Sequence, residues 1–428
     1  MKNGIFFLTY NGYYNFTSGI GTQTNTFLRG IEAYYKKFEK IYGEFEINLI
    51  VPEFDRTVDG FSQKYIDFAD EIVNKLGGKV YKCDSSLDIA NTDFWTVSNW
   101  ERICVSASAI ILEEASKYKN SIVIAVDPPF LHVPKYIEEH REKSSPEIQS
   151  IILMYTSSYI HDEKLLHEKL EWEHSGLASV LEYENIKIGK TCNYMHDHLM
   201  EFYGSDSKSF VPYSSSLFLE DNIFNKLSKS KVVDILSKYN IPADKNIIFA
   251  FGRMARVKGF DILLKNFRQV QNNAHLVLLA TTFEDLVDEY KSVIKKENIS
   301  CSLITQFTRE LPIALCQHQQ CRIVVCPSRS EPFSNIPLEV ALWARDQGPV
   351  VLTSNVGGFI EQIDDKKSGF IFDIKDSKDL VEKIKFILQL SDEQLESIRL
   401  TACEKVIKER DFFNNFGLLL SSIWVQPG

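Results

Sequence analysis

Residues 247–261, with the sequence IIFAFGRMARVKGFD, decide the fold class of this chain. A short apolar run, Ile247–Ala250, leads into a turn with two glycines and three basic residues, and an amphipathic segment begins at Asp261. A wholly apolar run of this length is typical of a strand that is buried on both faces of a parallel sheet. The stretch therefore predicts a strand, a tight turn and a helix in succession.

The same succession recurs along the whole chain. Further apolar runs predict buried strands at Ile5–Thr9, Ile47–Val51, Ser121–Val126, Ile151–Tyr155, Leu276–Leu279, Ile323–Cys326 and Val350–Thr353. Amphipathic stretches predict helices at Thr22–Phe38, Asp261–Phe267 and Asp379–Leu388. Alternating strands and helices predict the α/β class, with parallel sheets covered by helices on both faces.

A polar, turn-rich stretch divides the 428 residues into two strand-first halves. It runs from Val211 to Lys245, just before the strand that begins at Ile247. We expect one Rossmann-like domain in residues 1–215, a second in residues 216–410, and a C-terminal helix in residues 411–428 that crosses back to the first. Two such sheets would face a central cleft at the carboxyl ends of their strands, where open α/β sheets bind ligands.

Composition excludes several classes of protein. A net charge of −10 disfavours nucleic acid as a partner, and residues 1–200 carry most of it, with 20 basic and 29 acidic side chains. Neither a signal peptide nor an apolar run of membrane-spanning length is visible, so a cytoplasmic protein without stable membrane insertion is expected. The eight cysteines lack paired C-x-x-C spacing, which favours free thiols.

A glycine-rich turn follows the first predicted strand. Gly19-Ile20-Gly21-Thr22 would open a helix beginning around Thr22, where backbone N–H groups can approach a phosphate. The turn lacks the third glycine of a dinucleotide fingerprint, so NAD binding is disfavoured. A plain tight turn remains an alternative interpretation.

Several stretches of the second half contain charged residues or glycines that could bind a ligand. The turn at 251–261 offers Arg253 and Lys258 to a diphosphate. Cys326–Ala341 contains Glu331 and, eight residues further on, Glu339, so two carboxylates could face one ligand from a loop and the helix after it. Two further glycine-containing stretches follow, at 356–361 and 368–370.

These motifs, in this order and spacing, resemble those of retaining glycosyltransferases of the GT-B fold, family 4 (glycosyl transferases group 1). A second likeness is to glycogen and starch synthases. The resemblance is specific over about 120 residues of the second half, and in the first half only the turn at Gly19 clearly corresponds. It implies an acceptor-binding domain in residues 1–215 and a nucleotide-sugar-binding domain in residues 216–410.

The resemblance also implies roles for single residues. Arg253 and Lys258 would neutralise the donor diphosphate, Glu339 would hold the ribose hydroxyls, and Glu331 would contact the donor sugar as a catalytic residue. The donor-binding set it implies is Gly19, Gly21, Arg253, Lys258, Phe333, Ser334, Asn335, Ile336 and Glu339. Phe307, Arg309 and Leu311 would lie in the region of the nucleotide base.

A catalytic histidine from the first domain is implied as well. His132, in the stretch that follows the strand Ser121–Val126, is the first candidate, and His161 competes with it. His196 and His198 lack a third ligand at suitable spacing, so neither a metal nor another cofactor is expected. The sequence departs from the family pattern at Ser334, where the family commonly has glycine. It also lacks the lysine that glycogen synthases place before the glycine pair that begins at Gly19, which puts activity as a glucan polymerase in doubt.

The expected function is transfer of a hexose, with retention, from a nucleotide-sugar donor, expected to be a UDP-sugar. The acidic first half favours a soluble, sugar-like acceptor such as an aminocyclitol. Alternatives are transfer in surface polysaccharide or glucan synthesis, a non-catalytic GT-B protein that binds nucleotide-sugars, and an epimerase or phosphorylase of the same architecture. The sequence leaves the oligomeric state open.

Overall fold

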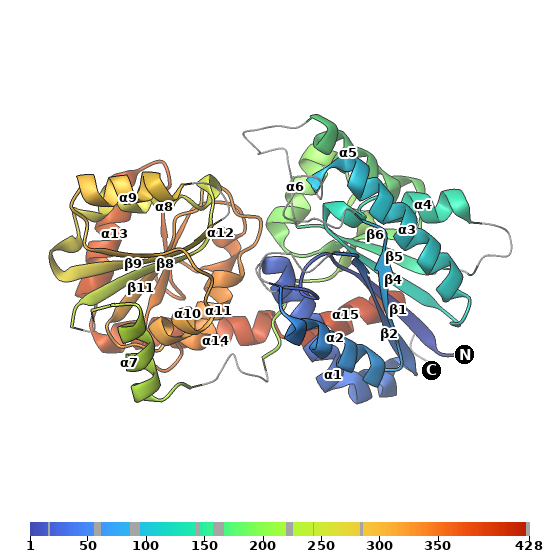
Figure 1. The fold of residues 1–428 in the computed structure, drawn as a ribbon, viewed down its shortest axis with the longest axis horizontal. Helices are drawn as coiled ribbons and strands as arrows, with labels where there is room; N and C mark the ends of the chain where they lie inside the picture. Colours follow the sequence, from blue (N-terminus) through green and yellow to red (C-terminus); the bar gives the residue numbers. More distant parts are fainter. Residues whose placement is uncertain are drawn as a thin grey trace. The chain divides into compact units, whose positions relative to one another are not determined.

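The computed structural model describes residues 1–15, 18–54, 61–85, 95–141, 146, 148–156, 167–219, 226–242, 244–282 and 286–424. The chain divides into two compact units, which are residues 1–218 together with 410–428, and residues 219–409. Each unit contains one parallel sheet with helices on its faces (Figure 1). The predicted α/β class is therefore confirmed. No helix in the described part of the chain is long and apolar enough to cross a membrane.

The sheet of unit 1 has seven strands in the order β3-β2-β1-β4-β5-β6-β7. The strands are β1 (Asn3–Leu8), β2 (Phe45–Pro52), β3 (Val80–Cys83), β4 (Ser121–Val126), β5 (Ile148–Met154), β6 (Ile186–Lys190) and β7 (Phe210–Pro212). The helices are α1 (Gly19–Tyr42), α2 (Gln63–Lys75), α3 (Val97–Ala115), α4 (Val133–His140), α5 (His167–Glu182), α6 (Asn193–Tyr203) and α15 (Phe412–Ile423). The order reverses between β1 and β4, as in doubly wound sheets.

The sheet of unit 2 has six strands in the order β10-β9-β8-β11-β12-β13. The strands are β8 (Asn246–Met254), β9 (Ala274–Thr282), β10 (Cys301–Ile304), β11 (Cys321–Cys326), β12 (Val350–Ser354) and β13 (Phe370–Phe372). The helices are α7 (Lys229–Lys238), α8 (Phe260–Phe267), α9 (Val287–Lys296), α10 (Glu310–Cys316), α11 (Asn335–Trp343), α12 (Phe359–Gln362), α13 (Ser377–Gln389) and α14 (Asp392–Glu409). Here the order reverses between β8 and β11.

Strand β8 shows why the second sheet needs helices on both faces. Ile248 and Ala250 belong to one apolar cluster, with α8, α9 and α13, whereas Ile247 and Phe249 belong to another, with α7, α10 and α11. Successive side chains of a strand point to opposite faces, so a wholly apolar strand is stable only between two covering layers. The apolar run Ile247–Ala250 thus specifies a central strand.

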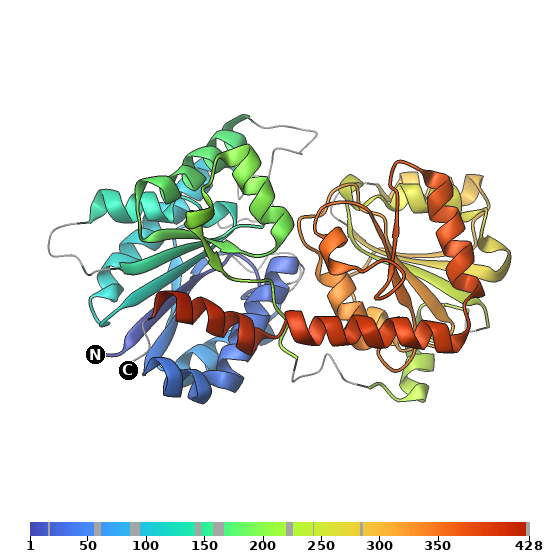
Figure 2. The ribbon, with the colours of Figure 1, turned by 180° about the vertical axis from the view of Figure 1, so that it is seen from behind.

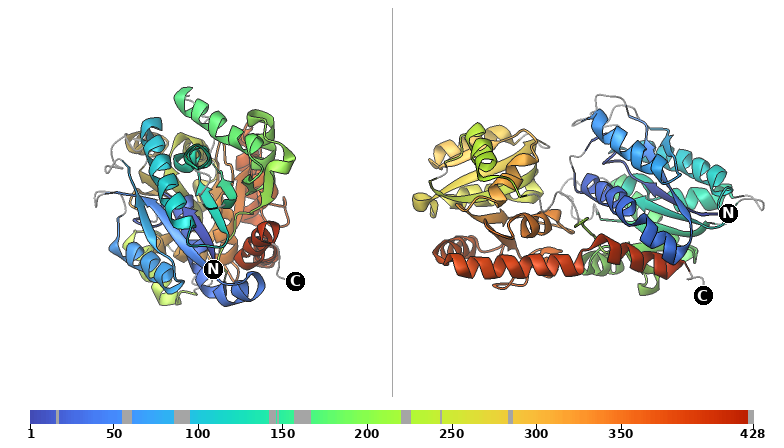
Figure 3. Two further views of the ribbon diagram at one scale, coloured as in Figure 1. Left: turned by 90° about the vertical axis from the view of Figure 1, so that its right-hand side faces the viewer. Right: turned by 90° about the horizontal axis from the view of Figure 1, so that it is seen from below.

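The last helix, α15, packs within unit 1 although it is the last element of the chain. It lies beside α1 (Figure 2), and the further views agree (Figure 3). Aromatic rings form the contact: Phe27 meets Phe416 edge to face, and Phe38 stacks on Phe413. Burial of these rings explains why the amphipathic C-terminal helix packs within the first unit.

Gly30 permits the close packing of α1 against α15. A Cβ atom at this position would lie 2.2 Å from the ring of Phe412. Alanine is normally the better helix residue, but here the clash outweighs propensity, and we expect Gly30→Ala to lower the free energy of unfolding by about 1–3 kcal/mol. Urea unfolding of the full chain measures this change.

Gly417 in α15 provides the matched control. A Cβ atom there would lie 3.8 Å from the nearest atoms, Phe38 Cε1 and the Tyr42 hydroxyl, which is ordinary contact distance. Gly417→Ala should therefore raise the free energy of unfolding, by up to about 1 kcal/mol. Equal effects of the two substitutions would contradict the packing argument.

Candidate functional site

The strand order of unit 2 reverses between β8 and β11, and open α/β sheets bind ligands at the carboxyl ends of the strands at such a reversal. Arg253 lies at the carboxyl end of β8, and Lys258 lies in the short 3₁₀ turn that follows, Arg256–Lys258. Glu331 lies in the loop after β11. Three residues predicted from two separate motifs thus lie at one edge of one sheet.

Lys258 and Glu331 form an ion pair. Lys258 Nζ lies 2.5 Å from Glu331 Oε2, and the two side chains are 17% and 9% exposed. Ser328 Oγ lies 3.4 Å from the same carboxylate oxygen. The ion pair therefore holds a partly buried ammonium against a buried carboxylate at this edge of the sheet.

Two glycines let neighbouring turns approach this pair. Gly259 has a φ of +68°, and a Cβ atom there would lie 1.9 Å from the carbonyl oxygen of Pro327. A Cβ atom at Gly358 would lie 2.4 Å from the carbonyl oxygen of Pro332, and the Gly358 N–H donates to the carbonyl of Glu331 at 3.0 Å. The turns after β8, β11 and β12 are therefore packed backbone to backbone.

Helix α11 begins at the same edge and contains three of the predicted donor-binding residues, and two more directly precede it. Ser334 is its N-cap, with Oγ accepting from the N–H of Ile336 at 3.3 Å, and its carbonyl accepts from Gln362 Nε2 at 2.6 Å. Phe333 precedes this cap and Asn335 is the first helical residue. The serine in place of the family's glycine thus supplies a helix cap, and the positive end of α11 lies at this edge of the sheet.

Ile336 lies beside the end of β8. Its Cδ1 is 3.8 Å from the position that a Cβ atom of Gly252 would occupy, and Gly252 has a φ of +149°. A side chain at Gly252 would therefore strain the backbone next to Arg253. The structure brings the start of α11 and the glycine turn together.

Glu339 lies one turn into α11 and is buried. Burial raises the pKa of its carboxyl, and the guanidinium of Arg309, 3.8 Å away, opposes that rise. A carboxylate so weakly compensated is suited to accept hydrogen bonds from ligand hydroxyls.

The three residues predicted for the nucleotide base are placed differently from one another. Phe307 has a side chain that is 51% exposed, and Arg309 is the N-cap of α10, next to Glu339. Leu311 is fully buried among the apolar residues of unit 2. Leu311 therefore contributes to the core, which leaves Phe307 and Arg309 as the residues available to a base.

Gly19 and Gly21 belong to the other unit. The helix α1 begins at Gly19, three residues before the expected start, because Ser18 caps it by accepting from the Gly21 N–H at 3.2 Å. Both glycines therefore lie in the first turn of α1. This turn follows β1, which pairs with β4, so it lies at the reversal point of the first sheet.

His132 is buried at the start of α4. Its Nε2 donates to the carbonyl oxygen of Trp172 at 2.9 Å, and its ring stacks on that indole with centroids 3.8 Å apart. Burial lowers the pKa of His132. A catalytic role for His132 would require Nδ1 or a break in these contacts, and its competitor His161 lies outside the described residues.

Asp127 is a buried acid that the sequence analysis did not single out. It directly follows β4 with a φ of 59° and a ψ of −174°, a conformation that glycine alone adopts readily. Its carboxylate accepts from the N–H of Thr156 at 2.7 Å and from its hydroxyl at 3.0 Å, which joins the ends of β4 and β5. The sequence signal that could have identified Asp127 is its position directly after the buried strand Ser121–Val126.

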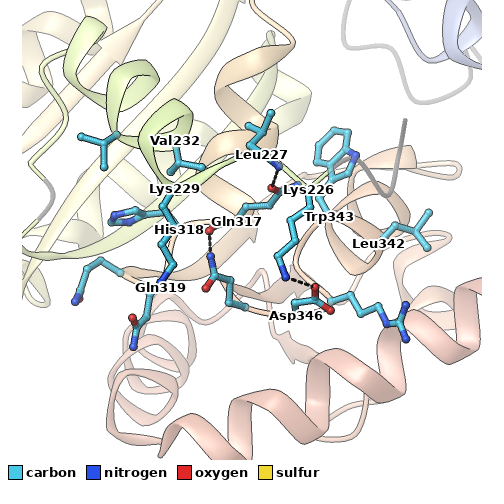
Figure 4. Close-up of a pocket in the computed structure, with 14 residues that line it drawn as sticks. Lys226, Leu227, Lys229, Val232, Gln317, His318, Gln319, Leu342, Trp343 and Asp346 are labelled. Carbon is cyan, nitrogen blue, oxygen red and sulfur yellow. Dashed lines mark hydrogen bonds and ion pairs between the residues drawn. The ribbon is translucent and has the colours of Figure 1, made fainter. Parts of the chain in front are cut away.

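A pocket of unit 2 lies elsewhere. It encloses about 470 Å³ and is lined by α7, the loop 317–320 and the end of α11 (Figure 4). Lys226 pairs with Asp346 there at 3.0 Å, and the Leu227 N–H donates to Gln317 Oε1 at 2.8 Å. Because the loop 317–320 precedes β11, this pocket lies at the opposite edge of the sheet from Glu331.

Solved structures share this architecture across the chain. Sucrose-phosphate synthase from Thermosynechococcus elongatus matches with a TM-score of 0.71 and 14% identity, covering 98% of this chain and 97% of that one. Alr3699/HepE of Anabaena, in complex with UDP and glucose, matches with a TM-score of 0.67 and 13% identity, covering 98% of both. The fold is that of GT-B glycosyltransferases.

A family model matches the second unit. Residues 234–402 are similar to the family of glycosyl transferases group 1. The capsular polysaccharide biosynthesis glycosyltransferase CapM of Staphylococcus aureus is 26% identical over 163 residues, which are 37% of this chain and 40% of that protein. The match spans about two fifths of the length of the curated relatives.

The raised pKa of Glu339 gives a prediction with a definite sign. Its ionised form costs folding free energy above that pKa, and the cost disappears as the pH falls through it. We expect Glu339→Gln to raise the melting temperature at pH 8 by about 2–4 °C, an effect of about 1 kcal/mol, and the gain to shrink as the solution is acidified. Thermal unfolding of both proteins across pH measures it.

Glu331→Gln is the opposing control. It removes the counter-ion of the poorly exposed Lys258, so it should lower the melting temperature at pH 8. A Glu339→Gln variant that is less stable than the natural protein at pH 8 would show that Arg309 outweighs burial.

Proposed function

We propose that this chain is a retaining, nucleotide-sugar-dependent glycosyltransferase that adds a sugar during synthesis of a surface polysaccharide. The observation that carries the proposal is the convergence of Lys258, Glu331 and the start of α11 at the carboxyl ends of β8 and β11. A cation, a carboxylate and a helix N-terminus at one edge match the needs of a sugar diphosphate.

Each group has a distinct part in donor binding. Arg253, Lys258 and the N–H groups at the start of α11 would neutralise the diphosphate, while Glu339 would accept from the ribose hydroxyls. Glu331 would accept from hydroxyls of the donor sugar and hold Lys258 at the phosphate. For the first unit, we propose that the backbone of Gly19 and Gly21 contacts a phosphate.

Chemistry in this family proceeds with retention. The acceptor hydroxyl oxygen would form its bond to the anomeric carbon on the face from which the diphosphate oxygen departs, and that diphosphate oxygen would take the hydroxyl proton. Lys258 and Arg253 would stabilise the negative charge that develops on the leaving diphosphate. This route needs no enzymic nucleophile.

The acceptor assignment departs from the aminocyclitol expectation. The curated relative is named for capsular polysaccharide biosynthesis, which supports the alternative of surface polysaccharide synthesis. The acidic charge of residues 1–200, which favoured a cationic small molecule, is also compatible with a neutral saccharide acceptor. UDP as the donor nucleotide is supported by the structural likeness to HepE, which was solved with UDP and glucose.

A thermal-shift screen tests the donor site. UDP and UDP-glucose should raise the melting temperature of the purified protein, because a ligand that binds only the folded state stabilises it. Lys258→Ala and Glu339→Ala should abolish the shift. Lys229→Ala removes an exposed lysine of α7 in the same unit and should leave it unchanged. If UDP, GDP, ADP and dTDP all leave the melting temperature unchanged, the donor site is wrong.

An assay of UDP release tests the acceptor. With a UDP-sugar that binds, we expect release to accelerate on addition of oligosaccharide primers of surface polysaccharides and to stay at its background rate with aminocyclitols. The opposite preference would restore the small-molecule acceptor. Donor binding without release in either case would indicate a non-catalytic protein.

A further inference from the structure

We propose that Arg329 and Asp261 form a brace that positions Lys258 against Glu331. This inference deepens the donor site and rests on the proposed function for its catalytic meaning. Neither residue is part of the donor-binding set that the family motifs imply. Both are positioning residues that would act through Lys258.

The brace is a two-point ion pair. Arg329 donates from Nη1 to Asp261 Oδ1 at 2.8 Å and from Nη2 to Asp261 Oδ2 at 2.9 Å, and the aspartate side chain is 4% exposed. Lys265 adds a hydrogen bond to the same carboxylate at 3.2 Å. Burial raises the pKa of Asp261, but the bonds from Arg329 and Lys265 outweigh burial and hold it below its usual value.

Arg329 also holds the backbone of the turn that carries Lys258. Its own N–H donates to the carbonyl of Val257 at 2.7 Å, and its Nη1 donates to the carbonyl of Arg256 at 2.7 Å. The residue on the other side of Lys258 is Gly259, which packs on the Pro327 carbonyl. Lys258 is therefore fixed on both sides by the loop that contains Arg329.

The same loop carries Glu331, two residues beyond Arg329. The position of the carboxylate and that of the ammonium are thus set by one side chain that reaches across both segments. A planar fork can make the two bonds to Asp261 and the bond to Arg256 together, whereas a lysine offers a single point of charge. These three bonds therefore require an arginine at position 329, because a positive charge alone cannot form them all.

Hydrogen exchange in the free protein tests the brace without any ligand. Arg329→Lys and Asp261→Asn should each accelerate amide exchange in both 256–260 and 328–334. Glu289→Gln is the matched control, because Glu289 pairs with the side chain of Arg256 on the same turn but makes no contact in the brace. It should leave exchange at 328–334 unchanged.

Calorimetric titration with UDP, well below the unfolding temperature, tests the positioning role. Both variants should weaken UDP binding roughly tenfold or more, because small misplacements of a charged group are costly, and the control should bind as the natural protein does. The double variant should bind UDP no more weakly than whichever single variant binds it less tightly, because each substitution breaks the same ion pair.

Each outcome is decisive. Exchange that stays slow at both segments in Arg329→Lys and Asp261→Asn would overturn the brace. Faster exchange with unchanged UDP affinity would reduce the pair to a structural role and overturn the positioning. A natural protein that binds none of the nucleotides would contradict the proposed function instead, while the exchange data would still decide whether Arg329 joins the two segments.

Discussion

The approach of Gly259 to the carbonyl of Pro327 is the constraint on which the site depends. The position demands a left-handed backbone and leaves no room for a Cβ atom, so two independent requirements select glycine. The contact presses the turn after β8 against the loop after β11. Because β8 and β11 are neighbours at the reversal point of the sheet, this contact brings Lys258 to Glu331 from a distance of 73 residues along the chain.

The charges around this contact are compensated to different degrees. Among the described residues, Lys258 lies 2.5 Å from Glu331 and Arg329 contacts Asp261 at two points, whereas Arg309 lies 3.8 Å from Glu339. A buried charge is tolerated when it is paired closely. Glu339 is the least closely paired of these three carboxylates. In the donor-binding role that we propose for it, this single helix residue would carry both a cost in stability and a gain in binding.

The sequence predicted the central strands of both sheets and missed the edges. The four outermost strands, β3, β7, β10 and β13, are three or four residues long, and β6 next to β7 has five. Central strands are buried on both faces and so form continuous apolar runs, whereas an edge strand such as Cys301–Ile304 is only partly buried along its length. Length and burial, which make the pattern visible, are both lacking at an edge.

For the site, motif spacing identified residues on one loop but not the direction of their side chains. Glu331 and Glu339 were predicted from their spacing of eight residues after an apolar strand, and the structure places them in the loop after β11 and in α11. Leu311 lies in α10, where it belongs to an apolar core cluster, and His132, at the start of α4, stacks on Trp172. Asp261 and Arg329 are 68 residues apart, and only the folded backbone shows that one guanidinium spans both turns. The position of a residue at a sheet edge therefore depends on topology, which sequence patterns can predict. The direction of its side chain depends on packing, which those patterns do not predict.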